Sequence, residues 1–310
     1  MAMIVVEGVT KVFRDFIAVD GISFIVEEGS VFGFIGPNGA GKTTTLSMIA
    51  TLLEPDAGEI TVGGFNTIDY PQAVRSLIGY MPDHVGMYDG VRIWEYLDFF
   101  AAAYRIDGPA RKRVIEDTLE LTDLAGVRDK LISTLSKGMR QRLVLAKTLL
   151  HDPKVLLLDE PAAGLDPRAR IELRVLLKEL QKMGKTIVIS SHILTELSDM
   201  CDSVGIVEGG RMVTSGSVDS ILARRDPMQR LKIRVLDDAE RAANTLRSIE
   251  RVSEVERDNG YVTFSYSGAE SGIPALLKGL LEQDVNIVSV EHASRNLEDV
   301  FMSVTRGEIR

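Results

Sequence analysis

The fold is decided by one stretch, Val155-Leu156-Leu157-Leu158-Asp159-Glu160-Pro161. Its four leading apolar residues predict a buried strand, because strands covered on both faces of a parallel sheet read as continuous hydrophobic runs. Asp159 and Glu160 stand at the carboxyl end of that strand. Open α/β sheets bind their ligands at this edge. The stretch therefore predicts an α/β fold that presents two carboxylates to a ligand.

A glycine-rich segment lies upstream of that strand, Gly36-Pro37-Asn38-Gly39-Ala40-Gly41-Lys42-Thr43. It follows the apolar run Val31–Ile35 and fits the phosphate-loop pattern in full. Its glycines let consecutive backbone N–H groups face phosphates, Lys42 reaches the β- and γ-phosphates, and the Thr43 hydroxyl is a ligand for Mg²⁺. We therefore expect this segment, extended by Thr44, to bind a nucleotide with Mg²⁺.

A third segment, Leu135-Ser136-Lys137-Gly138-Met139-Arg140-Gln141-Arg142, precedes the carboxylate strand. Ser136 is a good N-cap, and the amides of the first helical turn form a ready anion site. Together, the three segments resemble the nucleotide-binding subunit of an ATP-binding-cassette (ABC) transporter. The family signature commonly reads Leu-Ser-Gly-Gly-Gln, so Lys137 replaces a glycine here and Met139 replaces the glutamine. The resemblance implies that this segment contacts the γ-phosphate of ATP bound to the opposite subunit.

The resemblance also implies roles for single residues near the nucleotide. Asp159 would hold Mg²⁺, and Glu160 would be the general base or orient the attacking water. Asp83 stands where the family places a glutamine; a carboxylate can still contact Mg²⁺ or its water, although it cannot donate a hydrogen bond. His192 follows the predicted strand Thr186–Ser190 and matches the switch histidine near the γ-phosphate.

Two further matches concern the dimer and the base. Asp166 matches the loop that crosses the family's dimer interface, and it is also a good N-cap for a helix beginning at Pro167; the two roles are compatible. Phe13 resembles the aromatic residue that stacks on adenine. Phe16 is the alternative, and a core position for Phe13 stays open. The implied sets are thus catalytic (Lys42, Glu160, His192), metal-binding (Thr43, Asp83, Asp159) and signature residues acting in trans (Ser136, Lys137, Gly138, Met139).

Size and charge narrow the class of protein. The chain has 310 residues, which predicts two domains, and its net charge of −9 argues against a partner such as nucleic acid, which selects basic surfaces. The lone Cys201 excludes an internal disulfide.

No apolar run has the length that crosses a bilayer, and the N-terminus lacks the basic lead of a signal peptide. We therefore expect any membrane part on another chain.

Hydrophobic periodicity divides the chain into an α/β domain and a smaller α+β domain. Residues 1–222 form the first, in which a helix is predicted over 42–53 and an inserted helical subdomain over about 84–150. A charged linker is predicted around Ile221–Arg230. We expect the membrane partner to contact the helical subdomain near Val85–Trp94, where aromatic residues and Met87 are of types enriched at interfaces.

Residues 229–310 predict the order β-α-β-β-α-β, which is that of a ferredoxin-like α+β domain. A strong turn signal at Asp258-Asn259-Gly260 joins two of the strands, and a closing helix is predicted over Asn296–Thr305. This tail resembles, more loosely, a C-terminal extension of bacterial exporter-type ATPases. It carries no recognisable phosphate or metal ligand, so we expect an accessory domain that tunes dimerisation or partner choice.

The resemblance implies an ATP-hydrolysing subunit that dimerises around two ATP molecules and drives a separate transmembrane permease, with export as the expected direction. It would lie peripherally on the cytoplasmic face of the membrane. A homodimer is the simpler expectation, and a heterodimer with a related subunit stays open. One alternative is a soluble ABC ATPase acting on ribosomes or DNA, which the single cassette and acidic charge disfavour. The other is a regulatory nucleotide sensor, which Glu160 and His192 disfavour.

Overall fold

The structure is a computed structural model of the whole chain, and it describes all residues except 85, 89, 194–199, 223–228, 237–238 and 293–310. The chain forms two compact units, residues 1–218 and 219–300, divided at the start of the short helix α7 (Val218–Leu222). The predicted closing helix and the centre of the predicted linker lie outside the described residues. None of the helices in the described part combines the length and hydropathy that crossing a bilayer requires.

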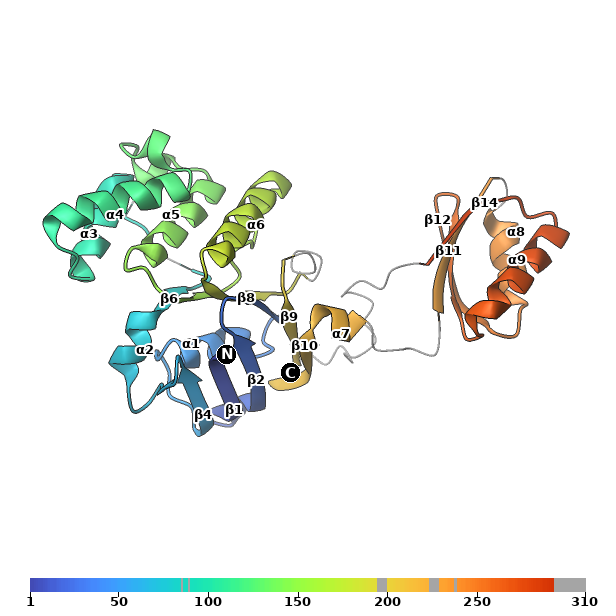
Figure 1. Cartoon of the computed structure of the whole chain (residues 1–310), viewed down its shortest axis with the longest axis horizontal. Helices are drawn as coiled ribbons and strands as arrows, with labels where there is room; N and C mark the ends of the chain where they lie inside the picture. Colours follow the sequence, from blue (N-terminus) through green and yellow to red (C-terminus); the bar gives the residue numbers. More distant parts are fainter. Residues whose placement is uncertain (85, 89, 194–199, 223–228, 237–238, 293–310) are drawn as a thin grey trace. The chain divides into compact units, whose positions relative to one another are not determined.

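A six-stranded sheet forms the centre of the first unit (Figure 1). Its order is β10-β9-β3-β8-β7-β6, and all neighbours are parallel except the β9–β10 hairpin. β3 (Val31–Ile35) and β7 (Val155–Leu158) are buried along their whole length, as expected of strands covered on both faces. The other four strands are β6 (Ile78–Met81), β8 (Thr186–Ser191), β9 (Ser203–Glu208) and β10 (Arg211–Ser217).

The parallel register brings the carboxyl ends of four strands to one edge of this sheet. Met81 of β6 pairs with Leu158 of β7, which in turn pairs with Ile189 of β8. Ile35 of β3 pairs with Ser191 of β8. The segments that leave these strands therefore begin side by side, although they are far apart in the sequence.

The first unit also contains a second, antiparallel sheet, which the sequence pattern does not distinguish from the main sheet. Its order is β2-β1-β4-β5, and its hydrophobic residues share one core with the main sheet. Phe24 of β2 stacks on Phe32 of β3, with ring centroids 4.9 Å apart. Bulges shift the β1–β2 register at several points and break the strict alternation that marks a strand in sequence. The strands are β1 (Ala2–Phe13), β2 (Phe16–Glu27), β4 (Ala57–Val62) and β5 (Phe65–Asn66).

The helix after the glycine loop, α1 (Lys42–Ile49), is shorter than the predicted helix over 42–53. The amide of Ala50 still bonds to the carbonyl oxygen of Leu46, but Thr51 has a φ angle of +59°. A left-handed residue ends a helix. The prediction that the helix continues to residue 53 was wrong, because Pro55 only prevents a helix from continuing past it and does not fix where the helix ends. The next helix is α2 (Pro71–Leu77).

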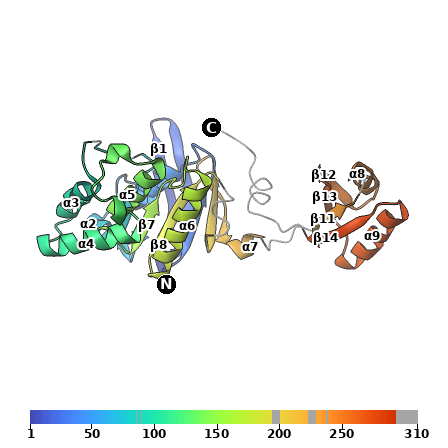
Figure 2. The same ribbon diagram turned by 90° about the horizontal axis from the view of Figure 1, so that it is seen from above.

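The inserted helical subdomain has a core of its own. α3 (Ile93–Ala103), α4 (Gly108–Leu121) and α5 (Lys137–Leu149) gather away from β1, β2 and β4 (Figures 1 and 2). Their shared core includes fully buried side chains on all three helices, among them Leu97, Leu119 and Leu143. α6 (Pro167–Lys182) then joins β7 to β8.

The second unit has the predicted ferredoxin-like order. Its sheet runs β12-β13-β11-β14 with every pair antiparallel, and α8 and α9 lie on one face (Figures 1 and 2). Ile233, Leu246, Phe264 and Leu280 are buried between the helices and the sheet. The elements are β11 (Gln229–Val235), α8 (Ala239–Arg247), β12 (Val252–Asp258), β13 (Tyr261–Tyr266), α9 (Ile273–Glu282) and β14 (Ile287–His292).

Candidate functional site

The glycine loop between β3 and α1 depends on its glycines for its shape. Gly39 and Gly41 have φ angles of +81° and +97°, in the left-handed region. A Cβ at Gly41 would also lie 2.6 Å from the carbonyl oxygen of Ala18. α1 begins immediately afterwards at Lys42, so the amides of its first turn are free of intrahelical partners and available to an anion.

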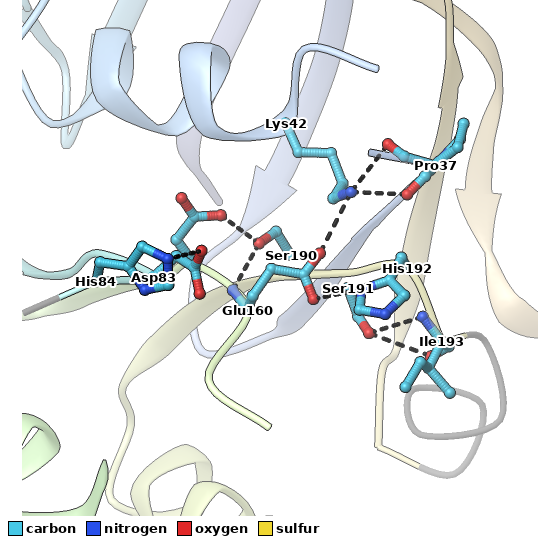
Figure 3. A network of polar contacts seen from close by, with 11 residues as sticks. Pro37, Lys42, Asp83, His84, Glu160, Ser190, Ser191, His192 and Ile193 are labelled. Carbon is cyan, nitrogen blue, oxygen red and sulfur yellow. Dashed lines mark hydrogen bonds and ion pairs between the residues drawn. The ribbon is translucent and has the colours of Figure 1, made fainter. Parts of the chain in front are cut away.

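The Lys42 side chain points toward the start of this loop, near Pro37 (Figure 3). It is only 5% exposed. Its Nζ donates to the carbonyl oxygens of Gly36 at 2.7 Å and Pro37 at 3.1 Å. It also lies 3.3 Å from Oε1 of Glu160, at the end of β7. A buried ammonium needs such partners, because an unpaired charge in the interior is costly. The loop cation therefore meets the strand-end carboxylate directly.

Glu160 stands between Lys42 and His192. Its Oε2 lies 2.8 Å from Nδ1 of His192 (Figure 3). The carboxylate is 13% exposed, whereas the imidazole is 42% exposed and reaches solvent. The backbone of Glu160 is left-handed, with a φ of +48°, which is uncommon for a residue other than glycine. The three side chains form one chain of polar contacts from the loop to the surface.

Ser190, which was not singled out from the sequence, organises the end of β7. Its hydroxyl donates to Oδ1 of Asp159 at 2.6 Å and accepts from the amide of Glu160 at 2.8 Å. The side chain is fully buried. In the sequence, Ser190 is recognisable only as a serine at the end of the predicted strand Thr186–Ser190. In the structure this strand pairs in parallel with the carboxylate strand. Only the register of β7 on β8 reveals the contact.

Asp159 is buried, and burial raises the pKa of its carboxyl above the usual value. Hydrogen bonds from the hydroxyls of Ser190 and Thr43 oppose that shift of the pKa, and the nearby charges of Asp83 and Glu160 add to it. Oδ2 of Asp159 is buried without a hydrogen-bond partner among the described residues. Ionisation of a carboxyl buried in this way requires a cation beside it.

The residues around Asp159 fit a magnesium ion bound with a nucleotide. Thr43 and Asp159 supply a hydroxyl and a carboxylate, and Mg²⁺ prefers oxygen ligands. The described residues contain no cluster of three or more His, Cys, Asp and Glu side chains that could hold a metal alone. Mg²⁺ sites commonly use one or two carboxylates together with substrate phosphates.

Asp83 follows β6, and the strand register brings it to the same edge as Asp159. It lies beside His84 (Figure 3), whose Nε2 is 3.7 Å from its Oδ2. Both side chains are exposed to solvent, Asp83 less than His84. The charge of Asp83 is therefore near enough to raise the pKa of Asp159. The Asp83 side chain is also accessible to solvent.

The signature segment begins α5, as expected, with Ser136 as its N-cap. The Ser136 hydroxyl accepts from the amide of Met139 at 3.2 Å. Ser136 lines a hollow of about 390 Å³ with Gly138, Met139 and Asp166. Asp166 caps α6 and accepts from the amide of Ala169 at 2.9 Å. Four predicted residues thus line this hollow, whose lining does not include Lys42, Glu160 or His192; Lys137 instead lines a different hollow with Asp83.

Phe13 is not a core residue. It pairs with Phe16 at the tip of the β1–β2 hairpin, and each side chain is 46% exposed. Lys11 lies over the ring of Phe13, with Nζ 5.7 Å from the centroid. Both rings are therefore partly exposed to solvent, and Lys11 lies over one face of Phe13.

Family comparisons match both units. The family described as "ABC transporter" matches residues 19–163, and that described as "ATP-binding protein DrrA1-3-like, C-terminal domain" matches residues 216–305. The linearmycin resistance ATP-binding protein LnrL of Bacillus subtilis (strain 168) is 32% identical over 313 residues, covering 99% of this chain and 100% of that protein. The Nod factor export ATP-binding protein I of Burkholderia lata is 33% identical over 303 residues, covering 98% and 97%.

Solved structures agree with the fold of the first unit. The ATP-binding subunit of an ABC transporter aligns with a TM-score of 0.64 at 30% identity, over 71% of this chain and 91% of that one. CbiO1 from Clostridium perfringens, part of the ABC transporter complex CbiONQ, aligns with a TM-score of 0.66 at 30% identity, over 72% and 91%. Members of this family bind ATP, generally with Mg²⁺, and work with a membrane permease. The chain belongs to the ATP-binding subunits of ABC transporters and is a transport ATPase.

Proposed function

We propose that two copies of the chain close around two ATP molecules, each bound between the glycine loop of one copy and the start of α5 of the other. One observation carries this proposal: the phosphate-binding features fall into two separate groups. Lys42 lies with Glu160 and His192, whereas Ser136 shares its hollow with Asp166. A two-fold dimer completes both composite sites at once. A heterodimer with a related subunit would be built in the same way.

The glycine loop binds the phosphates of ATP within one copy. Lys42 exchanges two carbonyl oxygens and Glu160 for phosphate oxygens, so phosphate binding releases the carboxylate. Phe13 stacks on the adenine, and Phe16 is exposed to the same extent. The proposed phosphate ligands are Gly36, Pro37, Asn38, Gly39, Ala40, Gly41, Lys42, Thr43 and Thr44.

Hydrolysis is assigned to the side chains at the end of β7 and β8. Thr43 and Asp159 would hold Mg²⁺, with Asp83 as a further direct or water-mediated contact, and the ion would neutralise phosphate charge. Glu160, once Lys42 has moved to the phosphates, orients the attacking water and accepts its proton. His192 holds the second oxygen of Glu160 and reaches solvent beside it, where a γ-phosphate can be contacted.

Export of a substrate through a separate permease, from the cytoplasmic face of the membrane, is the transport function we propose. The support for export is the similarity to a Nod factor export protein and a linearmycin resistance protein along nearly the whole chain. The proposed permease contact is the segment between Asp83 and α3. In its described part Tyr88 is 62% exposed, which suits an interface residue.

The composite site is tested by mixing two inactive variants, Lys42→Ala and Ser136→Arg. Each mixed dimer contains one site with both defects and one site with neither, so mixing is expected to restore part of the ATPase activity. Differently tagged chains verify that mixed dimers form, and each variant mixed with itself is the control. Complete absence of recovered activity in verified mixed dimers would contradict the proposal.

A further inference from the structure

The helices α5 and α6 begin side by side (Figures 1 and 2). A Cβ at Gly138, in the first turn of α5, would lie 3.2 Å from the Cβ of Ala169, in the first turn of α6. That distance is shorter than an ordinary van der Waals contact, so the absence of a side chain at Gly138 lets the two helix starts meet. Ser136 and Asp166, the N-caps of the two helices, line one hollow.

One turn further along, an ion pair joins the same two helices. Arg142 of α5 donates from Nη2 to Oε2 of Glu172 of α6. These residues follow Gly138 and Ala169 in the same order, so α5 and α6 run in parallel at these turns. Arg142 also donates from Nη1 to Oδ2 of Asp123, just after α4, at 2.7 Å. Its guanidinium is 15% exposed and bridges three helical segments.

The parallel arrangement of the two helices requires an attraction between them. The N-terminus of a helix carries partial positive charge, so two starts that lie side by side repel each other. Arg168 adds a cation at the start of α6, and its Nε lies 3.0 Å from Oε1 of Glu172. That bond stays within α6, whereas the bond from Arg142 crosses from α5. The planar guanidinium suits this task because its donors form a rigid fork that can meet two carboxylates.

We propose that Arg142 is a positioning residue, which holds the start of α5 beside the start of α6 so that Ser136 and Asp166 present one preformed surface. In the proposed dimer this surface meets the ATP bound by the glycine loop of the other copy. That consequence rests on the proposed function, whereas the positioning itself does not. A preformed surface strengthens association because its groups need not be ordered on binding.

Hydrogen–deuterium exchange without nucleotide tests the positioning. The reporters are the amides of Met139 in α5 and Ala169 in α6, which donate to the side chains of the two N-caps. Arg142→Met keeps a long side chain and removes the bridge. We expect exchange at both reporters to become faster by roughly two- to five-fold, the size of a weak ion pair's effect.

Two further variants show whether the bond between the helices is responsible. Arg168→Met is the matched control, because it removes the other partner of Glu172 without breaking the bridge, and it should leave exchange at Met139 unchanged. The effects of Arg142→Met and Glu172→Gln should be less than additive, because both variants remove the same bond. Glu172→Gln alone should speed exchange at both reporters, which keeps the test available if Arg142→Met does not fold. Additive effects, or an equal response of Met139 to Arg168→Met, would overturn the proposal.

ATP-induced dimerisation of the Glu160→Gln chain separates positioning from a general loss of stability. Adding Arg142→Met should raise the dimer dissociation constant by roughly four- to ten-fold, because each dimer has two such surfaces and each is weakened about two- to three-fold. The ATP affinity of the single chain should stay unchanged. Arg128→Met is the control, because it removes an ion pair with Glu116 elsewhere in the helical subdomain and should leave dimerisation unchanged.

The two measurements distinguish failure of this proposal from failure of the proposed function. Unchanged dimerisation in Arg142→Met would overturn the positioning role if mixed dimers of Lys42→Ala and Ser136→Arg regain activity. If verified mixed dimers stay inactive, the composite ATP site is wrong, and the exchange results without nucleotide alone decide whether Arg142 positions the two helices.

Discussion

At the scale of single residues, Glu160 is held through both of its carboxylate oxygens, by Lys42 on one side and His192 on the other. Lys42 draws one carboxylate oxygen toward the phosphate loop, and His192 holds the other at the surface. Glu160→Gln keeps the shape but cannot accept a proton as a carboxylate does. We expect ATP binding to persist while turnover falls by roughly a hundred-fold or more, the usual contribution of a general base. ATP-bound dimers should accumulate in size-exclusion chromatography. Near-normal turnover would remove Glu160 from the catalytic role.

Lys42→Ala is expected to act on binding as well as on turnover. The ammonium neutralises phosphate charge in the ground state, and losing charge-assisted hydrogen bonds costs about 1.5–3 kcal/mol. Nucleotide affinity should therefore fall by roughly ten- to a hundred-fold in calorimetry. Glu160→Gln serves as the matched comparison, because it neutralises the carboxylate beside Lys42 while the lysine keeps its hydrogen bonds to the carbonyl oxygens of Gly36 and Pro37. Unchanged affinity in Lys42→Ala would contradict the assignment.

Sites formed within one contiguous motif are predictable from local sequence, whereas contacts made across the sheet are not; the resemblance grouped Lys42, Glu160 and His192 but did not give their contacts. The glycine loop and the Ser136 cap act through their own backbone, so their spacing alone indicates an anion site. The bond from Ser190 to Asp159 and the pair of Lys42 with Glu160 join segments that are adjacent only in the folded sheet. No local pattern specifies such a pair.

At the scale of elements, His151 connects three parts of the first unit. It follows α5, stacks on Tyr104 beyond α3 with ring centroids 4.2 Å apart, and bonds through Nε2 to the carbonyl oxygen of Ile78 in β6 at 2.9 Å. Nδ1 is buried without a hydrogen-bond partner among the described residues. Burial lowers the pKa of His151, and the bond to Ile78 opposes this shift of the pKa only in part.

The lowered pKa predicts a loss of stability in acid that depends on His151. As the pH falls through about 6.5, the unfolded chain binds a proton at this residue before the folded chain does, so the free energy of unfolding decreases. His151→Phe keeps a ring against Tyr104 and cannot titrate, but it loses the bond to Ile78. It should be less stable than the wild type by about 1 kcal/mol at pH 8, and this difference should shrink by pH 5.5. Urea unfolding at both pH values measures it; a constant difference would exclude the mechanism.

Elements were predictable where burial leaves a simple pattern. β3 and β7 read as continuous apolar runs because both of their faces are covered. The antiparallel sheet is not evident in the sequence because its bulges interrupt the alternation. The predicted helix over 42–53 is longer than α1 because the end of α1 depends on the left-handed Thr51. Backbone conformations of this kind are set by packing around the segment, so composition does not reveal them.

At the scale of the whole molecule, the two units have separate cores. One core lies between the two sheets of the first unit, and another, around Ile233, Phe264 and Leu280, lies entirely within the second. Every residue assigned to ATP or Mg²⁺ belongs to the first unit. This separation predicts that the second unit tunes self-association or permease assembly and leaves nucleotide chemistry to the first.

Truncation after Ala223 tests this division of labour. Nucleotide affinity should stay within about three-fold of the full chain, a change of less than 1 kcal/mol, because the glycine loop, Asp159 and Glu160 keep all their described partners. Self-association, measured as dimer mass with ATP and the Glu160→Gln substitution, should weaken.

Circular dichroism and a cooperative thermal transition establish that the shortened chain is folded, and the Lys42→Ala full chain marks the level of lost binding. A folded truncated chain whose affinity drops to that level would place the second unit in the active site and refute the division.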